Sequence, residues 1–597
     1  VLTVATEATL SATSTETATG AEQGGSVTLN APTMNLLGQV GVFAETQGEV
    51  PAGTLTLTSG DTSGDLSINF QNPDPTAQTR LPRISASTSG SGQGGNLVVS
   101  APNSIAIAGN GTLAVETTGV GNAGTATFTT QQLTLRDAAR ISASTAGTGA
   151  GGGIWLEAQN LFITDGSQVL SRTTGAGAAG SINVIVVDNF TIAGAGSGLF
   201  ANTTAGSSGA GGNIWIDPER VSLRDRAGIA VNSQGTGNSG RIDLFANTLS
   251  LSGDSFISAE TVSGASEGIF LRNLRDLTVQ NSDISASTAT GSAGQLSVDA
   301  RAAITLSGVA TTGEGGLRVE ATNGGTAGSL TINTDRLRIT DGAEASVSSP
   351  TGLAGNLTIQ ARDVRLNQGT ILAETGQSVP GIDRAVINLS GLDFLELANE
   401  SLISASAFAA ANGGNISIAA DFIVAQAPTG ANGSDIIARA INGDGGRINI
   451  STTQLFNIAF RNNLTPFNDI NASSEFGLDG EVAIDTVNVD PTSNLNVLPD
   501  EPNQPELLAG CYTQGGEEAI AFYDVGLGGR PPQPEDIQTA DFAVAEWIDL
   551  DVTLAPTTAP GEQEPATITM ATPGAELQSF SILEASSSKF LANCRAN

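Results

Sequence analysis

The chain has 597 residues, of which 59 are acidic and 24 basic, so its formal net charge is −35. This charge excludes a basic surface for nucleic acid or anionic lipid, and the absence of histidine removes the commonest general base and metal ligand. Aromatic residues make up only 4% and glycine contributes 74 residues, but a hydrophobic content of 39% is too high for a disordered acidic chain and favours a long repeat array.

The amino terminus already reads as part of a repeat. Residues 1–16, VLTVATEATLSATSTE, have neither the basic start nor the apolar stretch of a signal peptide. We therefore expect that the native chain extends upstream, or that an open amino-terminal coil associates with a neighbouring subunit. No run of eighteen apolar residues occurs in the sequence, which argues against a membrane-spanning helix.

Short words of alternating apolar and polar residues recur from residue 25 to about residue 490, with a period of about thirty residues. One period, 180–212, contains GSINVIV, NFTIAG and GLFANTT, followed by the polar turn AGSSGAGG. Such alternation predicts strands with one buried face. The Asp-Gly pairs and glycine-rich clusters between the words are typical of turns that need positive φ. The phrase ISAS is itself repeated, at 84–87, 141–144, 284–287 and 403–406.

Three strands in each coil, with no helical pattern, predict an all-β parallel β-helix over residues 1–490. The strand spacing of about 4.8 Å sets the rise, and roughly sixteen three-strand coils account for the region. In ISAST, Ile and Ala are expected to point inward and the serines outward. We expect a core of small and aliphatic side chains, in which Ile, Leu and Val stack in columns. A longer step, from Gly53 to Gly95, predicts an insertion around 72–75.

Two tryptophans are candidates for a surface contact. Trp155 and Trp215 are each the middle residue of an alternating apolar triplet, so both are expected to face outward. They lie two coils apart, about 10 Å on the strand-spacing estimate, and Phe270 occupies the same phase two coils later. A row of exposed aromatics could stack on sugar rings or contact another protein. The alternative is a patch that a loop or a neighbouring coil covers.

Acidic residues are plentiful but scattered, so we assign no catalytic residue, no metal ligand and no cofactor. A denser acidic stretch from Asp435 to Asp479 is interpreted as solvated surface, with loosely bound calcium as the alternative. A β-helix polysaccharide lyase or glycosidase is the alternative function, because many such enzymes are parallel β-helices and glycosidases need paired carboxylates facing one substrate.

The character of the sequence changes near residue 490. The thirty-residue period stops, and eleven of the 22 prolines lie from Pro491 onward. Residues 491–510 are predicted to form an acidic, proline-rich linker. Residues 511–597 still contain strand-like words and are predicted to form a small β-rich module with the two cysteines of the chain, Cys511 and Cys594.

The end of the repeat region resembles a known family. GRINISTTQLFNIAFRNNLTPFNDINASSEFGLDGEVAIDTVNVDP, 446–491, is similar to the terminal repeats of cyanobacterial filamentous-haemagglutinin-like exoproteins, and LLAGC (507–511) and GLGGRPPQPED (526–536) resemble their tail. The resemblance implies a right-handed β-helix, exported through an outer-membrane transporter barrel by two-partner secretion. It implies a structural or adhesive role outside the cell or on the outer cell surface. The amino-terminal secretion domain of that family is not recognisable in this chain.

An extracellular location would place both cysteines in an oxidising environment. We therefore expect a disulfide between Cys511 and Cys594, with two free buried cysteines or an intermolecular bond as the alternatives. Some two-partner adhesins use a disulfide-closed carboxy-terminal segment as an anchor, which makes this loop a candidate anchor. The expected ligand is a polysaccharide, another cell-surface component or a sibling filament.

Overall fold

A computed structural model describes the chain over most of the predicted repeat region. The described residues form strands and no helix, so they contain no helix that could span a membrane. The predicted insertion at 72–75, the linker, the carboxy-terminal module and the cysteine pair Cys511 and Cys594 lie outside the described residues. The described ranges are 1–5, 8–17, 23–60, 64–71, 81–313, 315–379 and 385–486.

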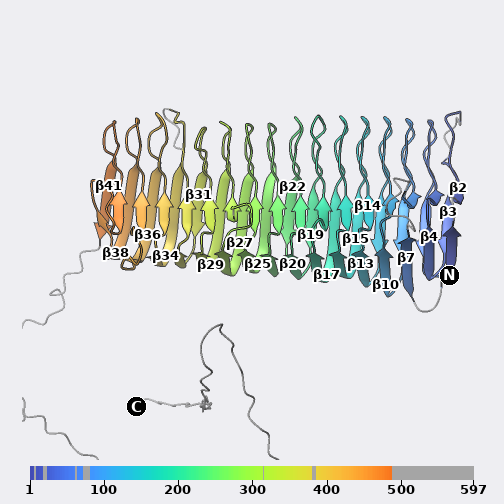
Figure 1. Cartoon of the computed structure of the whole chain (residues 1–597), viewed down its shortest axis with the longest axis horizontal. Helices are drawn as coiled ribbons and strands as arrows, with labels where there is room; N and C mark the ends of the chain where they lie inside the picture. The colour runs from blue at the N-terminus through green and yellow to red at the C-terminus, as the bar shows by residue number, and fades with distance from the viewer. Residues whose placement is uncertain are drawn as a thin grey trace, which may run out of the picture. The chain divides into compact units, whose positions relative to one another are not determined.

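The strands stack as a right-handed parallel β-helix of about 15 turns (Figure 1). The thirty-residue period predicted this stack with roughly sixteen coils, and the family resemblance implied its right hand. One turn consists of β12 (Ala126–Thr129), β13 (Gln132–Arg136) and the short β14 (Arg140–Ser142). We call the three faces that such strands build the first, second and third walls. Each strand pairs in parallel register with the strand one turn away, so a given position of the repeat forms a straight row along the helix axis.

In about half of the turns the first two strands of a coil are continuous. Backbone irregularities then mark the corner inside the long strand, for example between Ala158 and Asn160. These continuous strands are β15 (Ile154–Thr164), β17 (Ile182–Ala193), β25 (Gly268–Gln280), β27 (Gln295–Ser307), β29 (Ser329–Thr340), β34 (Val386–Ala398), β36 (Asn415–Ala425) and β38 (Arg447–Phe456).

The remaining strands belong to single walls. The first wall also contains β3 (Val27–Asn30), β6 (Leu55–Thr58), β9 (Leu97–Ser100), β19 (Ile214–Asp217), β22 (Arg241–Phe245), β31 (Asn356–Gln360) and β41 (Glu481–Thr486). The second contains β1 (Leu2–Ala5), β4 (Thr33–Leu37), β7 (Asp65–Gln71), β10 (Ser104–Ala108), β20 (Arg220–Arg224), β23 (Thr248–Ser252) and β32 (Asp363–Asn367). The third contains β2 (Thr9–Ser11), β5 (Gly41–Phe43), β8 (Arg83–Ser85), β11 (Thr112–Ala114), β16 (Gln168–Leu170), β18 (Gly198–Phe200), β21 (Gly228–Ala230), β24 (Phe256–Ser258), β26 (Asp283–Ser285), β28 (Gly316–Arg318), β30 (Glu344–Ser346), β33 (Thr370–Leu372), β35 (Leu402–Ser404), β37 (Asp435–Ile437) and β40 (Asp469–Asn471), with β39 (Ala459–Phe460) beside β40.

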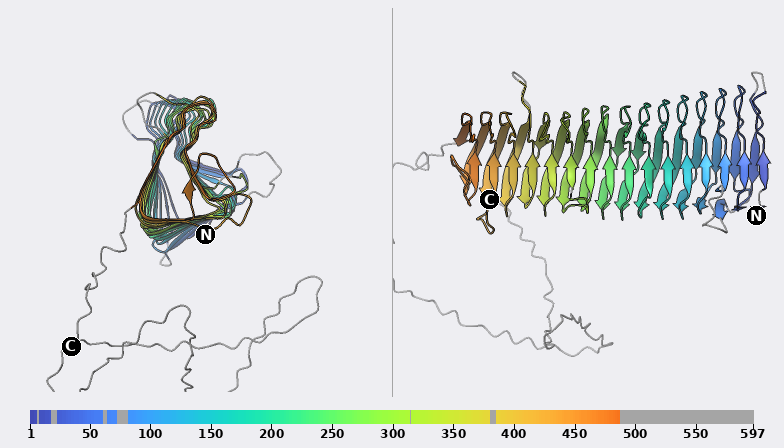
Figure 2. Two further views of the ribbon diagram at one scale, coloured as in Figure 1. Left: turned by 90° about the vertical axis from the view of Figure 1, so that its left-hand side faces the viewer. Right: turned by 45° about the horizontal axis from the view of Figure 1, so that its top comes forward.

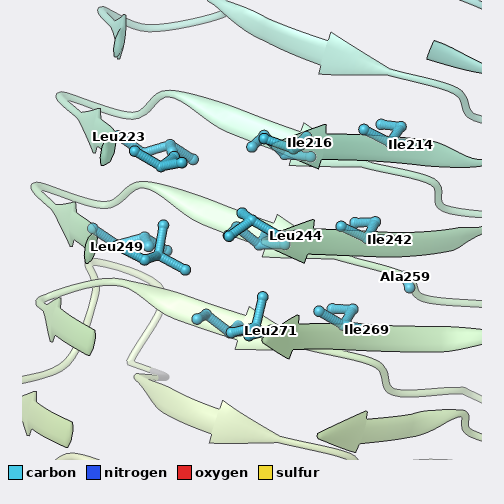
Figure 3. Packing of buried hydrophobic residues seen from close by; sticks show 14 of the residues in the cluster. Ile214, Ile216, Leu223, Ile242, Leu244, Leu249, Ala259, Ile269 and Leu271 are labelled. Carbon is cyan, nitrogen blue, oxygen red and sulfur yellow. The ribbon is translucent and has the colours of Figure 1, made fainter. Parts of the chain in front are cut away.

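The core consists of aliphatic columns along the axis. Figure 3 shows one column of Ile214, Ile242 and Ile269 and an adjacent one of Ile216, Leu244 and Leu271, all completely or almost completely buried. Burying one such side chain contributes about 1.5–3 kcal/mol, so repetition of the column stabilises every coil in the same way. The predicted core of small and aliphatic side chains is therefore confirmed.

The glycine-rich segments form a stack of loops after the third wall, which projects as one narrow ridge when the helix is viewed along its axis (Figure 2). A Cβ atom on Gly152 would lie 1.9 Å from the carbonyl oxygen of Gly124 on the preceding coil, and a Cβ on Gly180 would lie 1.9 Å from that of Gly152. The expectation of positive φ is wrong for Gly152 and Gly180, which are needed for close backbone approach, but it is met in the same loop stack at Gly206, with φ of 85°. Positive φ does occur at Asp165-Gly166 and Asp341-Gly342, as the Asp-Gly pairs predict.

The repeated ISAST word closes this loop. Ile141 and Ala143 point into the core, as expected, and Thr145 is also buried, with 2% of its surface exposed. The Thr145 hydroxyl donates a hydrogen bond of 2.6 Å to the carbonyl oxygen of Gly149. The first serine was expected to face solvent, but Ser142 is 3% exposed and its hydroxyl donates to the Glu116 carboxylate on the preceding coil, which covers it. The ISAST sequence recurs because its residues fill the core, form hydrogen bonds on the wall and close the loop.

Candidate functional site

The aromatic residues singled out in the sequence lie in one row of the first wall. Parallel pairing aligns Trp155 with Asn183, Asn183 with Trp215, Trp215 with Asp243, and Asp243 with Phe270. Trp155 and Trp215 are therefore separated by one intervening strand, which corresponds to about 10 Å. The row lies on the outer face because its inward-facing neighbours, such as Ile154 and Leu156, are fully buried in the core.

This row and the adjacent row of the first wall together form an apolar platform. Trp155 and the half-buried Trp215 lie in the first of these rows, and Ile185 and the half-buried Phe245 lie in the adjacent one. Trp155 is 39% exposed and Ile185 37% exposed, and the rings of Trp215 and Phe245 meet at a centroid distance of 6.1 Å with their planes tilted by 48°. Ile185 and Phe245 were not selected from the sequence. The alternation of apolar and polar residues could have identified both. In INVIV (182–186) and RIDLF (241–245), it places Ile185 and Phe245 on the outer face.

Phe270 lies under arginine side chains. The guanidinium carbon of Arg241 is 4.0 Å from the centre of the Phe270 ring, and that of Arg272 is 4.9 Å from it. Cation–π contacts at partly exposed sites contribute about 0.5–1 kcal/mol each. Phe270 therefore follows the alternative of a patch covered by neighbouring side chains. Arg272 also lies 5.5 Å from the centre of the Phe245 ring, so Phe245 forms the edge of the platform.

Asp243 holds these arginines in place. Its carboxylate accepts two hydrogen bonds from Arg241, at 2.6 and 2.7 Å, and one from Arg272, at 3.0 Å. The hydrogen bonds to Asp243 raise the pKa of Arg241 above its usual range. Arg241 therefore stays charged at any physiological pH, and the cluster is a permanent polar border to the apolar platform.

The acidic stretch near the end of the helix is partly structural. The interpretation as solvated surface is wrong for Asp435 and Asp469, because Asp469 is fully buried and its carboxylate bonds Arg461 and the Thr465 hydroxyl, the latter at 3.0 Å. The Asp435 carboxylate accepts the backbone N–H of Asp469 at 2.8 Å, and burial raises the pKa of Asp435. These bonds tie the loop at 461–468 to the third wall. Within the described ranges no three acidic or other metal-binding residues converge as a metal site.

A polar row on the third wall was not expected from the sequence. Carboxylates on some coils accept hydrogen bonds from the serine hydroxyls of a neighbouring ISAS word or its equivalent, as Glu374 does from Ser404 at 2.6 Å. Burial raises the pKa of Glu374, and the charge of Glu320 adds to the effect. The guanidinium of Arg318, with 7% of its side chain exposed, bonds Asp283 and Glu320 at 3.0 Å each. Because hydroxyls and a guanidinium engage these carboxylates, the row stabilises the wall.

Comparisons with models of protein families, with curated proteins and with solved structures found no match to this chain. Residues 446–491, whose sequence resembles a known family, include the last strands of the described β-helix. That segment comprises the last coil, with β38, β39 and β40, and the strand β41 that follows it.

Proposed function

We propose that this protein is a structural and adhesive β-helix of the cell exterior, which binds its ligand through an outer wall. The observation that carries the proposal is the apolar platform around Trp155 and Trp215, which two adjacent rows of the first wall present on a continuously hydrogen-bonded stack. Trp155 is exposed and Trp215 is half-buried, and such partly exposed aromatic rings at fixed spacing favour binding of sugar rings or of another apolar surface.

Binding is favoured over catalysis because of the groups near the platform. Asp243, the carboxylate that lies in the same row, already accepts three hydrogen bonds from Arg241 and Arg272. A carboxylate that two arginines already engage is poorly placed to take a proton from a substrate. The repetitive wall also suits a scaffold, because each coil supports the next one.

The cellular setting of the proposal comes from the resemblance of residues 446–491. It supports export through an outer-membrane transporter barrel and a location outside the cell or on its outer surface. The disulfide and anchor expected at Cys511 and Cys594 remain predictions.

The proposal is tested by retention of the purified chain on cells and on immobilised polysaccharides. We expect a variant carrying Trp155→Ala and Trp215→Ala to lose retention, whereas Thr331→Ala and Thr358→Ala, in the same row beyond the platform, should not change it. Equal retention of both variants would overturn the proposal. Release of new reducing ends or unsaturated sugars by the wild-type chain would instead favour the lyase or glycosidase alternative.

A further inference from the structure

We infer that the ligand of the platform is a neutral β-1,4-linked polysaccharide, whose extended chain lies along the helix axis and stacks alternate sugar rings on Trp155 and Trp215. The inference rests on the proposed adhesive function and names the class of its ligand. It follows from three features of the first wall, which are the spacing of the tryptophans, the residues between and beside them, and the local charge.

The spacing matches the repeat of such a chain. Trp155 and Trp215 occupy the same row with one strand between them, so their backbone positions lie about 10 Å apart along the axis. In an extended β-1,4-linked chain each sugar is turned by about half a turn relative to the last, so alternate rings present the same face, and two sugars span this same distance. One disaccharide therefore fits between the two indole rings.

The residues beside the tryptophans complete a track for this chain. Asn183 lies on the strand between them, and its side-chain amide makes no hydrogen bond within the described ranges. It can therefore donate to and accept from the hydroxyls of the intervening sugar. Toward the amino terminus the row continues with the small side chains of Thr127 and Val98, which leave room for further sugars. Toward the carboxy terminus the Asp243 cluster bounds the track.

The charge around the track selects a neutral chain. Glu157 and Asp217 occupy the adjacent row, beside Trp155 and Trp215 respectively, and the whole chain carries a formal charge of −35. A polyuronate would be repelled by both. A helical α-1,4-linked chain or a curved β-1,3-linked chain would leave the straight row after one or two sugars, so only one tryptophan would be engaged.

The first experiment measures binding of the chain to hexasaccharides by isothermal titration calorimetry. The probes are the hexamers of β-1,4-linked glucose, N-acetylglucosamine and mannose, compared with those of α-1,4-linked glucose, β-1,3-linked glucose and galacturonate. We expect at least one β-1,4-linked neutral hexamer to bind about tenfold more tightly than the three comparison sugars, and Trp155→Ala or Trp215→Ala to lower that affinity about tenfold. Equal binding of all six, or binding of galacturonate alone, would overturn the inference.

The second experiment tests spacing with a constant number of tryptophans. A variant with Asn183→Trp and Trp215→Ala carries two surface tryptophans on adjacent strands, and we expect it to bind the β-1,4-linked hexamer no better than Trp215→Ala alone. Restoration of wild-type affinity would show that spacing does not matter and would overturn the inference. Thr358→Ala serves as the control, and circular dichroism should be identical for all variants.

Failure of the inference and failure of the proposed function give different results. If no β-1,4-linked hexamer binds, but the double variant with Trp155→Ala and Trp215→Ala loses retention on cells, the platform is adhesive and its ligand class is wrong. If the double variant retains full cell adhesion, the proposed function is wrong, and any binding of hexamers then has no part in adhesion.

Discussion

The loop stack and the outer row of the first wall belong to the same coils, but they differ in what their sequence tolerates. In the loop stack, position after position holds glycine, because a Cβ on Gly124, Gly152 or Gly180 would collide with the carbonyl oxygen of the coil before it. In the outer row, the corresponding coils hold Thr127 and Trp155, and the next ones Asn183 and Trp215. Repetition thus marks close packing, and variation marks the surface that is free to bind.

This difference follows from what each position contacts. The loops approach backbone to backbone, so the packing has no space that a side chain could fill, and even one methyl group must displace main-chain atoms. A residue of the outer row has solvent on one side, and its contribution to folding is limited to its neighbours in adjacent rows. A functional residue can therefore change there without loss of the fold.

Two adjacent glycines offer the strongest test of this difference. A Cβ on Gly152 would lie 1.9 Å from a backbone oxygen, whereas a Cβ on Gly153 would meet its nearest atom, Nε1 of Trp155, at 3.4 Å. We expect Gly152→Ala to destabilise the surrounding coils by about 3 kcal/mol or more, because the backbone must shift. Gly153→Ala should change stability by less than about 0.5 kcal/mol.

Because a repeat array can lose order coil by coil, hydrogen exchange of the amides in β14 and β16 is the suitable measurement, supported by urea unfolding. Equal protection in the two variants would mean that the loops can separate at little cost. The close approach of successive loops would then not explain the repeated glycines.

The loop-closing threonines provide the next test. Thr145→Val removes the hydroxyl that donates to Gly149 at 2.6 Å and leaves a buried side chain of nearly the same shape. We expect a loss of about 2 kcal/mol, since the Gly149 carbonyl then loses its partner in a buried site. Thr127→Val, on the outer row, should be within about 0.5 kcal/mol of wild type. Urea midpoints that fall equally in both variants would contradict the structural role of the hydroxyl.

The periodic part of the fold was accessible from the sequence. The thirty-residue period and the alternation in words such as SINVI predicted parallel strands, aliphatic columns and the outward row that contains Trp155 and Trp215. These features depend on local alternation and on repetition, which a single sequence displays directly. The same alternation would have identified Ile185 and Phe245, had it been applied beyond the tryptophans.

Features that depend on contacts between coils were not accessible. Ser142 is outward in the alternation and yet buried, because Glu116 of another coil lies over it. Asp469 reads as solvated surface, but a loop folds back and places Arg461 against it. Phe270 occupies the right phase, and only the lateral position of Arg241 and Arg272 decides that its ring is covered. Alternation predicts which face of a strand a side chain occupies. It does not predict which residues of other coils or loops cover that face.

The third wall is intermediate between the closely packed loop stack and the exposed outer row. The pH dependence of stability at Glu374 tests its packing. Burial raises the pKa of Glu374 above its ordinary value of 4.5, so the folded state favours the neutral carboxyl. Its contribution to stability is fully present below pH 4.5 and is lost as the pH rises through the raised pKa. Glu374→Gln should therefore be more stable than wild type at pH 7, and the difference should shrink toward pH 4.

Paired urea titrations of the two proteins across this pH range provide the measurement. The comparison cancels the effect of carboxylates that do not interact with Glu374. A difference that grows as the pH falls would show that the folded state stabilises the ionised carboxylate, for example through the hydrogen bond from Ser404. Burial would then have a smaller influence on this carboxyl than its hydrogen bond.

The smallest effect on stability is expected at Trp155, the residue with the largest proposed role in binding. Thr occupies the row of Trp155 at positions 127, 331 and 358, so the wall already accommodates it, and Thr has a high strand propensity. Trp155→Thr should therefore keep the unfolding midpoint within the equivalent of about 0.5 kcal/mol, while adhesion is lost. A loss of stability as large as that of Thr145→Val would mean that the indole ring stabilises the wall. The aromatic row would then be structural in the same sense as the loop glycines, and its variation between coils would need another explanation than ligand binding.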